Sequence, residues 1–139
     1  MIYIGFNFSK ILIERINDKK NGEKINTKLD ISSMNKVDNT LNQNDSILSV
    51  KFSYSIEYSP DVAKIELDGN VLFTGSLEDV DKTIKSWENK EMDDDFKLSL
   101  FNIILKKSNI KALELEDELN LPPHMPLFSI KKDQLKKEE

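Results

Sequence analysis

The side chains best suited to catalysis are few and scattered along the chain. His124 is the only histidine, no cysteine is present, and His124 stands between Pro123 and Met125 with no acid beside it. A catalytic or metal-binding histidine needs partners that converge on it. No glycine-rich phosphate loop, nucleophile elbow or HExxH metal motif occurs in the sequence. We therefore expect a protein that is not an enzyme, with no catalytic residue, no metal site and no cofactor.

Three adjacent carboxylates, Asp93–Asp95, have two interpretations. They would form either a divalent-metal cluster or the start of a helix. Successive side chains on a helix point in different directions, so three neighbours do not converge on one ion. Carboxylates at a helix start accept free N–H groups and favour the positive end of the helix dipole. We interpret the three aspartates as a helix cap.

Two tyrosines, Tyr54 and Tyr58, lie on the apolar face of a predicted strand that runs from Leu48 to Tyr58. Apolar and polar residues alternate along this strand, and the pattern resumes after a turn at 59–61 and continues over 62–73. The sequence thus predicts one long β-hairpin. The tyrosines are either core residues or part of a groove, because tyrosine suits surfaces that contact apolar ligands while staying partly wet.

Two further strands precede this hairpin. Apolar residues occupy even positions up to Phe8 and odd positions from Ile11, and a phase change of this kind predicts a β-bulge within residues 2–16. Residues 25–31 alternate as a second strand, while the polar residues 33–46 are predicted to form a loop.

Two helices are predicted after the strands. Ser76 and Asp79 resemble a capping box for a helix that ends near Asn89, and a second helix spans 96–119. The first half of this second helix is apolar around nearly its whole circumference, so it needs cover on two sides, and we expect another subunit to supply the second. The predicted oligomer interface comprises Phe96, Leu98, Leu100, Phe101, Ile104 and Leu105.

The predicted fold class is α+β, with a four-stranded antiparallel sheet and a short and a long C-terminal helix packed on one face. Residues 1–130 are expected to form a single domain and residues 131–139 a charged C-terminal tail.

Charge and hydropathy narrow the classes of partner. The net charge is −5 with a pI near 5.0, whereas nucleic-acid-binding proteins usually carry a basic patch. No apolar run reaches the roughly 18–20 residues that a membrane span needs. The first residues lack the features of a signal peptide. We expect a cytoplasmic protein that neither binds nucleic acid nor inserts into a membrane.

The ordered elements resemble the SecB export-chaperone family, and short motifs carry the resemblance over most of residues 6–128. Phe6-Asn7-Phe8 followed by Ile11 is similar to the family's first strand, and Lys28-Leu29-Asp30-Ile31 to its second. Glu66-Leu67 through Val71-Leu72-Phe73 is similar to the end of its fourth strand. Leu100-Phe101-Asn102 stands where the family has Leu-Phe-Pro, and Leu119-Asn120-Leu121-Pro122-Pro123 is similar to its Leu-Asn-Leu-x-Pro.

Two features depart from the bacterial pattern. Ile103-Ile104-Leu105 replaces the family's Pro-Tyr-Ala-Arg run, and the tail that docks on the SecA motor is not recognisable in residues 131–139. The chain therefore resembles a divergent member, of the archaeal type or of the type associated with toxin–antitoxin systems, and the resemblance does not extend to a SecA-type motor.

The resemblance implies an ATP-independent holdase that keeps unfolded polypeptide clients soluble, in some members for protein export. It also implies a homotetramer built as a dimer of dimers, although the residues alone leave a dimer equally open. The predicted client-binding residues are Phe6, Phe8, Ile13, Tyr54, Tyr58, Leu121 and Phe128. Two alternatives remain open. One is a dedicated adaptor with a single partner such as an antitoxin, and the other is a small-ligand-binding α+β domain, which would need a closed pocket with convergent polar groups.

Overall fold

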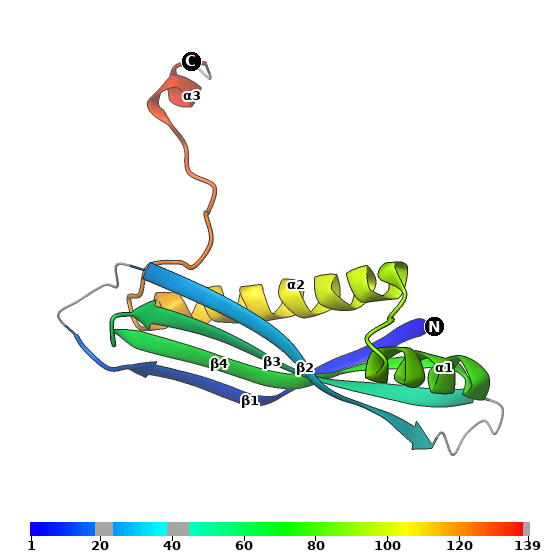
Figure 1. Ribbon diagram of the computed structural model, residues 1–139. Coiled ribbons are helices and arrows are strands. Elements are labelled where there is room, and N and C mark those ends of the chain that lie inside the picture. The colour runs from blue at the N-terminus through cyan, green and yellow to red at the C-terminus, as the bar shows by residue number, and fades with distance from the viewer. Residues whose placement is uncertain (19–23, 39–44, 138–139) are drawn as a thin grey trace.

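Four long strands form one antiparallel sheet in the computed structural model, which describes residues 1–18, 24–38 and 45–137 (Figure 1). The strands are β1 (Ile2–Arg15), β2 (Lys24–Asp38), β3 (Asp45–Ser59) and β4 (Ala63–Ser76). Their order in the sheet is β1-β4-β3-β2, so β1 pairs with β4, and β1 and β2 are the two edges. Three helices follow: α1 (Leu77–Glu88), α2 (Asp94–Glu118) and α3 (Lys132–Lys137). The α+β fold class predicted from the sequence is confirmed.

The hairpin of β3 and β4 supplies the core of the sheet. The register places Tyr54 opposite Leu67 and Phe52 opposite Gly69. Alternate residues of both strands point to the face that α2 covers, and they are buried as the pattern predicts. The buried apolar side chains of this face are Leu48, Val50, Phe52, Tyr54, Ile56, Tyr58, Ala63, Ile65, Leu67, Val71 and Phe73.

Bulges shift the register of both edge strands. In β1 the pairing with β4 shifts between Phe8 and Lys10, which confirms the bulge predicted from the phase change, and it shifts again near Tyr3. In β2 it shifts between Ile31 and Ser33. The loop predicted for 33–46 is wrong over 33–38, because that bulge reverses the alternation and lets the strand continue with Met34 buried. It is also wrong over 45–46, because β3 begins at Asp45. Residues 39–44 of that loop lie outside the described residues.

Cap side chains fix the start of both main helices. The Ser76 hydroxyl accepts from the Asp79 N–H at 3.1 Å, and the Asp93 carboxylate accepts from the Phe96 N–H at 3.2 Å. This confirms the interpretation of Asp93 as a helix cap. In the part of the chain that the structure describes, no group of three or more His, Cys, Asp or Glu side chains is placed to hold a metal ion.

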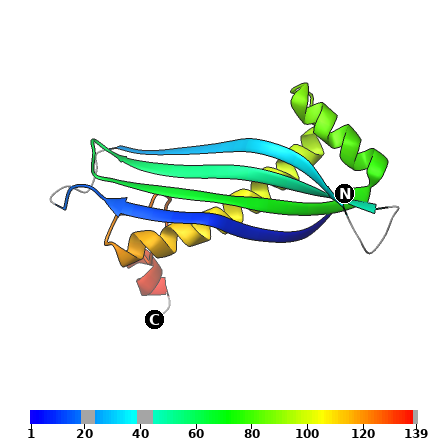
Figure 2. The ribbon, with the colours of Figure 1, turned by 90° about the horizontal axis from the view of Figure 1, so that it is seen from below.

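Helix α2 crosses one face of the sheet, as Figure 2 shows from the opposite side. Leu100, Ile104, Ala112 and Leu115 recur at helical spacing and are buried against the sheet. The helix thus divides the covered face, and inward side chains of β1 and β2 remain partly exposed on its two sides.

The chain turns back at the end of α2. The N–H of Leu121 donates to the Glu116 carbonyl at 2.8 Å, and Asn120 takes a positive φ of 54°, which together make a Schellman-type helix end. Beyond Met125 an extended segment stands away from the body and ends in α3 (Figure 1). No helix within residues 1–18, 24–38 and 45–137 is long and apolar enough to cross a membrane.

Candidate functional site

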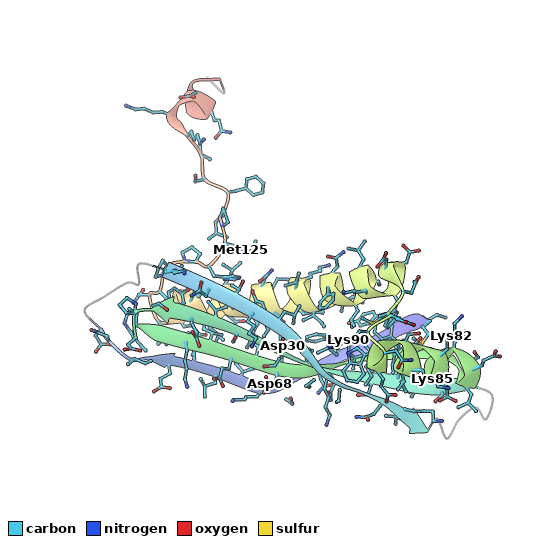
Figure 3. The ribbon with its side chains drawn as sticks, viewed as in Figure 1. Asp30, Asp68, Lys82, Lys85, Lys90 and Met125 are labelled. Atoms are coloured by element: carbon cyan, nitrogen blue, oxygen red, sulfur yellow. The ribbon has the colours of Figure 1, made fainter. Side chains whose placement is uncertain are left out.

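A groove of about 520 Å³ lies where β2, the end of α1 and the first half of α2 meet. Its apolar walls are half-buried side chains that solvent still reaches. These apolar residues are Leu29, Ile31, Trp87, Met92 and Phe101, and the charged residues beside them are Asp30, Lys90, Asp94 and Lys97. Asp30 and Lys90, which come from β2 and from the loop after α1, are labelled in Figure 3.

Local structure explains why these residues gather. Leu29 and Ile31 lie opposite Tyr54 and Phe52 of β3, so they share the face that α2 covers. Lys90 has a positive φ of 59°, and the Glu91 N–H donates to the Ser86 carbonyl at 2.8 Å, so the chain turns sharply after α1. That turn brings the end of α1 beside the start of α2.

The groove runs along a strand with one side unpaired. In the sheet formed by the described residues, β2 pairs with β3 alone, so the N–H and C=O groups of its other edge have no partner strand. An apolar trough beside such an edge can bind an extended peptide, since the peptide backbone pairs with the edge and its side chains enter the trough. The residues offer no convergent acid and base for a reaction.

A buried polar cluster closes the far end of the same side of α2. His124 contacts Glu116 through Nδ1 (2.9 Å to Oε1) and Asn109 through Nε2 (2.8 Å to Oδ1), and both the His124 and Glu116 side chains are almost fully buried. Tyr54 donates to Asn109 Oδ1 at 2.8 Å, and Tyr58 donates to Glu116. The cluster fastens the segment after α2 to both α2 and β3.

The two tyrosines of this cluster are held in their protonated form. Burial raises the pKa of the Tyr54 hydroxyl, and the charge of Glu116 raises it further. Burial is also the main cause that raises the pKa of Tyr58 far above its ordinary value, followed by its hydrogen bond to Glu116. Both hydroxyls therefore act as donors at neutral pH.

The open face of the sheet is polar by comparison. The Lys10 ammonium donates to Glu66 at 2.6 Å across β1 and β4. This hydrogen bond and charge pairing raise the pKa of Lys10, and the same hydrogen bond lowers the pKa of Glu66. Ion pairs and serines lie on this face, together with a few apolar side chains such as Leu12, Val37 and Leu72.

The seven predicted client-binding residues fall into three places. Phe6 and Phe8 are half-buried on β1 and stack with Phe52, with ring centroids 5.4 and 6.5 Å from that ring. Ile13 lies further along β1, partly buried against the core. Tyr54, Tyr58 and Leu121 are buried at or beside the polar cluster, and Phe128 is fully exposed on the extended segment. The structure does not bring these seven residues into one surface.

The six predicted interface residues also differ in position, since some are buried in the core and others are exposed. Leu100 and Ile104 are fully buried against the sheet of their own chain, so they are core residues and do not face solvent. Leu98 is 64% exposed, Phe96 packs on Phe73, and Phe101 lines the groove. Leu105 is half-buried. An oligomer interface stays a prediction, and only the exposed members of this set can take part in it.

Periodicity in the sequence does not identify most residues of the groove or the partners of His124. Leu29 and Ile31 were predicted as strand residues and Trp87 as part of an amphipathic helix, but none was assigned to a site. His124 has no acid beside it in the sequence, and the turn after α2 is what brings Glu116 to it. The only available signal was the spacing of Tyr54 and Tyr58, which puts both hydroxyls on one face of β3.

Comparisons with known proteins agree with this geometry at the level of the fold. The chain is similar to the Mycobacterium tuberculosis Rv1957 SecB-like chaperone, whose structure was solved in complex with a ChAD peptide from the Rv1956 HigA1 antitoxin. The match covers 93% of this chain and 91% of that chain, with a TM-score of 0.50 and 15% sequence identity.

The fold is SecB-like. No protein-family model matches the sequence, and no curated protein matches it. The similarity in structure therefore extends to the arrangement of the sheet and the helices.

Proposed function

We propose that this protein is an ATP-independent chaperone that binds extended, non-native polypeptide segments in the groove beside β2. The observation that carries the proposal is the half-exposed apolar trough of Leu29, Ile31 and Phe101 along the unpaired edge of the sheet. Exposed apolar surface of this kind marks an interaction site, and an edge strand supplies backbone pairing that does not depend on client sequence.

A second candidate is an adaptor that binds one partner. It is favoured by a specific observation, namely that the SecB-like neighbour was solved with a peptide from an antitoxin. A chaperone should bind many unrelated apolar peptides with similar affinity, whereas an adaptor should bind one strongly and the others weakly. Titrating a panel of unrelated peptides separates the two functions.

The first test uses the fluorescence of Trp87, which is the only tryptophan and lines the groove. Adding an apolar peptide of about ten residues should change its emission. The substitution I31S should weaken binding by about 1–2 kcal/mol, because it removes buried apolar area from the trough. Aggregation of a chemically unfolded, unrelated protein, followed by light scattering without nucleotide, should be suppressed by the wild type and less by I31S.

A matched control is available on the opposite edge. Ile11 of β1 is 48% exposed, and I11S makes the same chemical change outside the groove. If I11S weakens peptide binding and I31S does not, the clients bind along β1, where Phe6, Phe8 and Ile13 lie, and the groove beside β2 is not the site.

A further inference from the structure

The segment after the polar cluster is apolar and has no cover. Leu127, Phe128 and Ile130 are 60%, 111% and 73% exposed. Met125 marks the point where this segment leaves the body (Figure 3). Exposed apolar residues in succession are unfavourable in water, so this segment is suited to a partner surface.

The contacts of the polar cluster direct the chain after Leu121 back along α2. Leu121 bonds to the Glu116 carbonyl at the end of α2. The His124 N–H still contacts the Glu116 carboxylate, and the His124 ring extends from there to Asn109 and the Tyr54 ring. The chain thus runs back toward the start of α2.

The same flank of α2 leads into the groove. Phe101 precedes Asn109 by eight residues, about 2.2 helical turns, and Glu116 by fifteen, about 4.2 turns, so it lies less than a quarter of a turn around the helix from both. In the sheet, the register partner of Tyr54 is Leu29, which lines the groove. The fastened segment therefore ends where the groove begins.

The length of the exposed segment matches the groove. The six residues 125–130 span about 20 Å when extended. The twelve residues from Asn109 back to Lys97 rise about 18 Å along the helix. A continuation of the path from His124 would place Leu127, Phe128 and Ile130 between Leu29, Ile31 and Phe101, which are groove residues.

Charge continues the match beyond the apolar residues. Lys131 and Lys132 follow Ile130 directly, and on this path they reach the start of α2. Asp94 lines that end of the groove, and Asp95 stands next to it. The two aspartates offer opposite charge to these lysines, while Lys90 and Lys97, which also line the groove, carry the same charge.

We propose that residues 125–132 form a strap that closes into the groove of their own chain and competes with a bound polypeptide. The structure holds the strap in its open position, with its root fixed by His124. The competition rests on the proposed function of the groove, whereas closure of the strap does not. A strap closed in about four-fifths of the molecules would raise the apparent Kd of a client about fivefold.

Closure can be measured directly because the chain has no cysteine and one tryptophan. The variant S129C, labelled with bimane, places a fluorophore on the strap that tryptophan quenches on contact. We expect quenching in this protein and recovery of the emission when W87F is added. Emission that is equal with and without W87F would overturn the proposal. Quenching that disappears on dilution would also overturn it, since the strap would then enter a second copy.

Competition is tested by peptide titration of F128S against the control I110S, in which an exposed isoleucine of α2 is changed instead. Release of the strap should lower the peptide Kd about fivefold in F128S and leave it unchanged in I110S. A higher Kd in F128S would mean that Phe128 holds the client, which contradicts a competing strap. If no variant binds peptide but the bimane signal remains quenched, the proposed function fails and closure of the strap stands.

Discussion

Glu116 is almost fully buried, and its carboxylate serves donors from two separate segments of the chain. Tyr58 of β3 donates to it, and His124 approaches it through its backbone N–H (3.1 Å) and its ring Nδ1. A buried carboxylate is tolerated only when such partners satisfy it. Its removal would leave the His124 backbone N–H and ring Nδ1 without this partner, and Tyr58 with the Pro122 carbonyl as its remaining acceptor.

The substitution E116A should therefore lower the free energy of unfolding by about 3 kcal/mol, the usual cost of breaking a buried charged contact. The matched control is E114A, whose side chain is 56% exposed and paired with Lys111, and it should change stability by less than about 0.5 kcal/mol. Urea unfolding measures both values. Equal losses in the two variants would show that the cluster does not stabilise the fold.

The raised pKa values of Tyr54 and Tyr58 predict a loss of stability in alkali. The folded state keeps both protons above about pH 10, where the unfolded chain releases them. The free energy of unfolding should fall from that pH upward, by as much as about 1.4 kcal/mol per pH unit for each tyrosine. Unfolding at pH 8 to 11 should show this slope, and the double variant Y54F/Y58F should lose most of it. An unchanged slope in the double variant would show that the two tyrosines do not cause the loss of stability in alkali.

Where apolar and polar residues alternate regularly, the sequence predicts correctly which face of the sheet each residue occupies. The inward alternation of β3 and β4 placed Tyr54 and Tyr58 on the correct face, but it did not distinguish a core from a groove. The partners of His124 could not be predicted, because Asn120 and the turn that follows it bring residues together that are eight and fifteen positions apart.

Gly69 explains why β1 and β4 approach closely beside the bulge. A Cβ at Gly69 would lie 2.4 Å from the Asn7 carbonyl oxygen and 2.9 Å from the Phe52 ring. No side chain fits without moving the strand backbone.

We expect G69A to cost about 1–3 kcal/mol, because the two strands must separate to accept the methyl group. G5A, on the same pair of strands, meets only a Leu72 methyl group at 3.7 Å and should have a much smaller effect. Thermal or urea unfolding of both variants measures the difference. If the two variants are equally stable, the close contact at Gly69 does not limit the pairing.

Sequence patterns predicted the bulge of β1 beside Phe8 and missed both the register shift near Tyr3 and the bulge of β2 after Ile31. Around Phe8 and Ile11 the apolar residues on both sides reveal the change of phase. After Ile31 only Met34 and Val37 are apolar among polar residues, so the continued strand reads as a loop. The groove was missed for a related reason, since it depends on β2 being an edge, and periodicity does not show that β1 pairs with β4.

The exposed part of α2 supports the predicted oligomer. Leu98 is the most exposed apolar member of the predicted interface, at 64%. We propose that α2 packs against a second copy through this side of the helix. The state of assembly is then a dimer or a tetramer.

Light scattering should give a mass that is a multiple of 16.1 kDa, and L98E should reduce it, because a charge would be buried at the interface. The control I110E changes an isoleucine that is 59% exposed on the other half of α2. A wild-type mass of a single chain would contradict the oligomer. If I110E reduces the mass and L98E does not, the interface lies nearer the C-terminal end of α2.

The pairing of β1 with β4 also has a consequence for synthesis on the ribosome. Ile2 pairs with Thr74, so β1 cannot complete its pairing with β4 until 72 further residues have been added. At roughly 5–20 residues per second this delay is several seconds. During that time Ile2, Tyr3, Phe6 and Phe8 have no partner strand from β4. The nascent chain thus exposes the kind of apolar segment that the finished protein is proposed to bind.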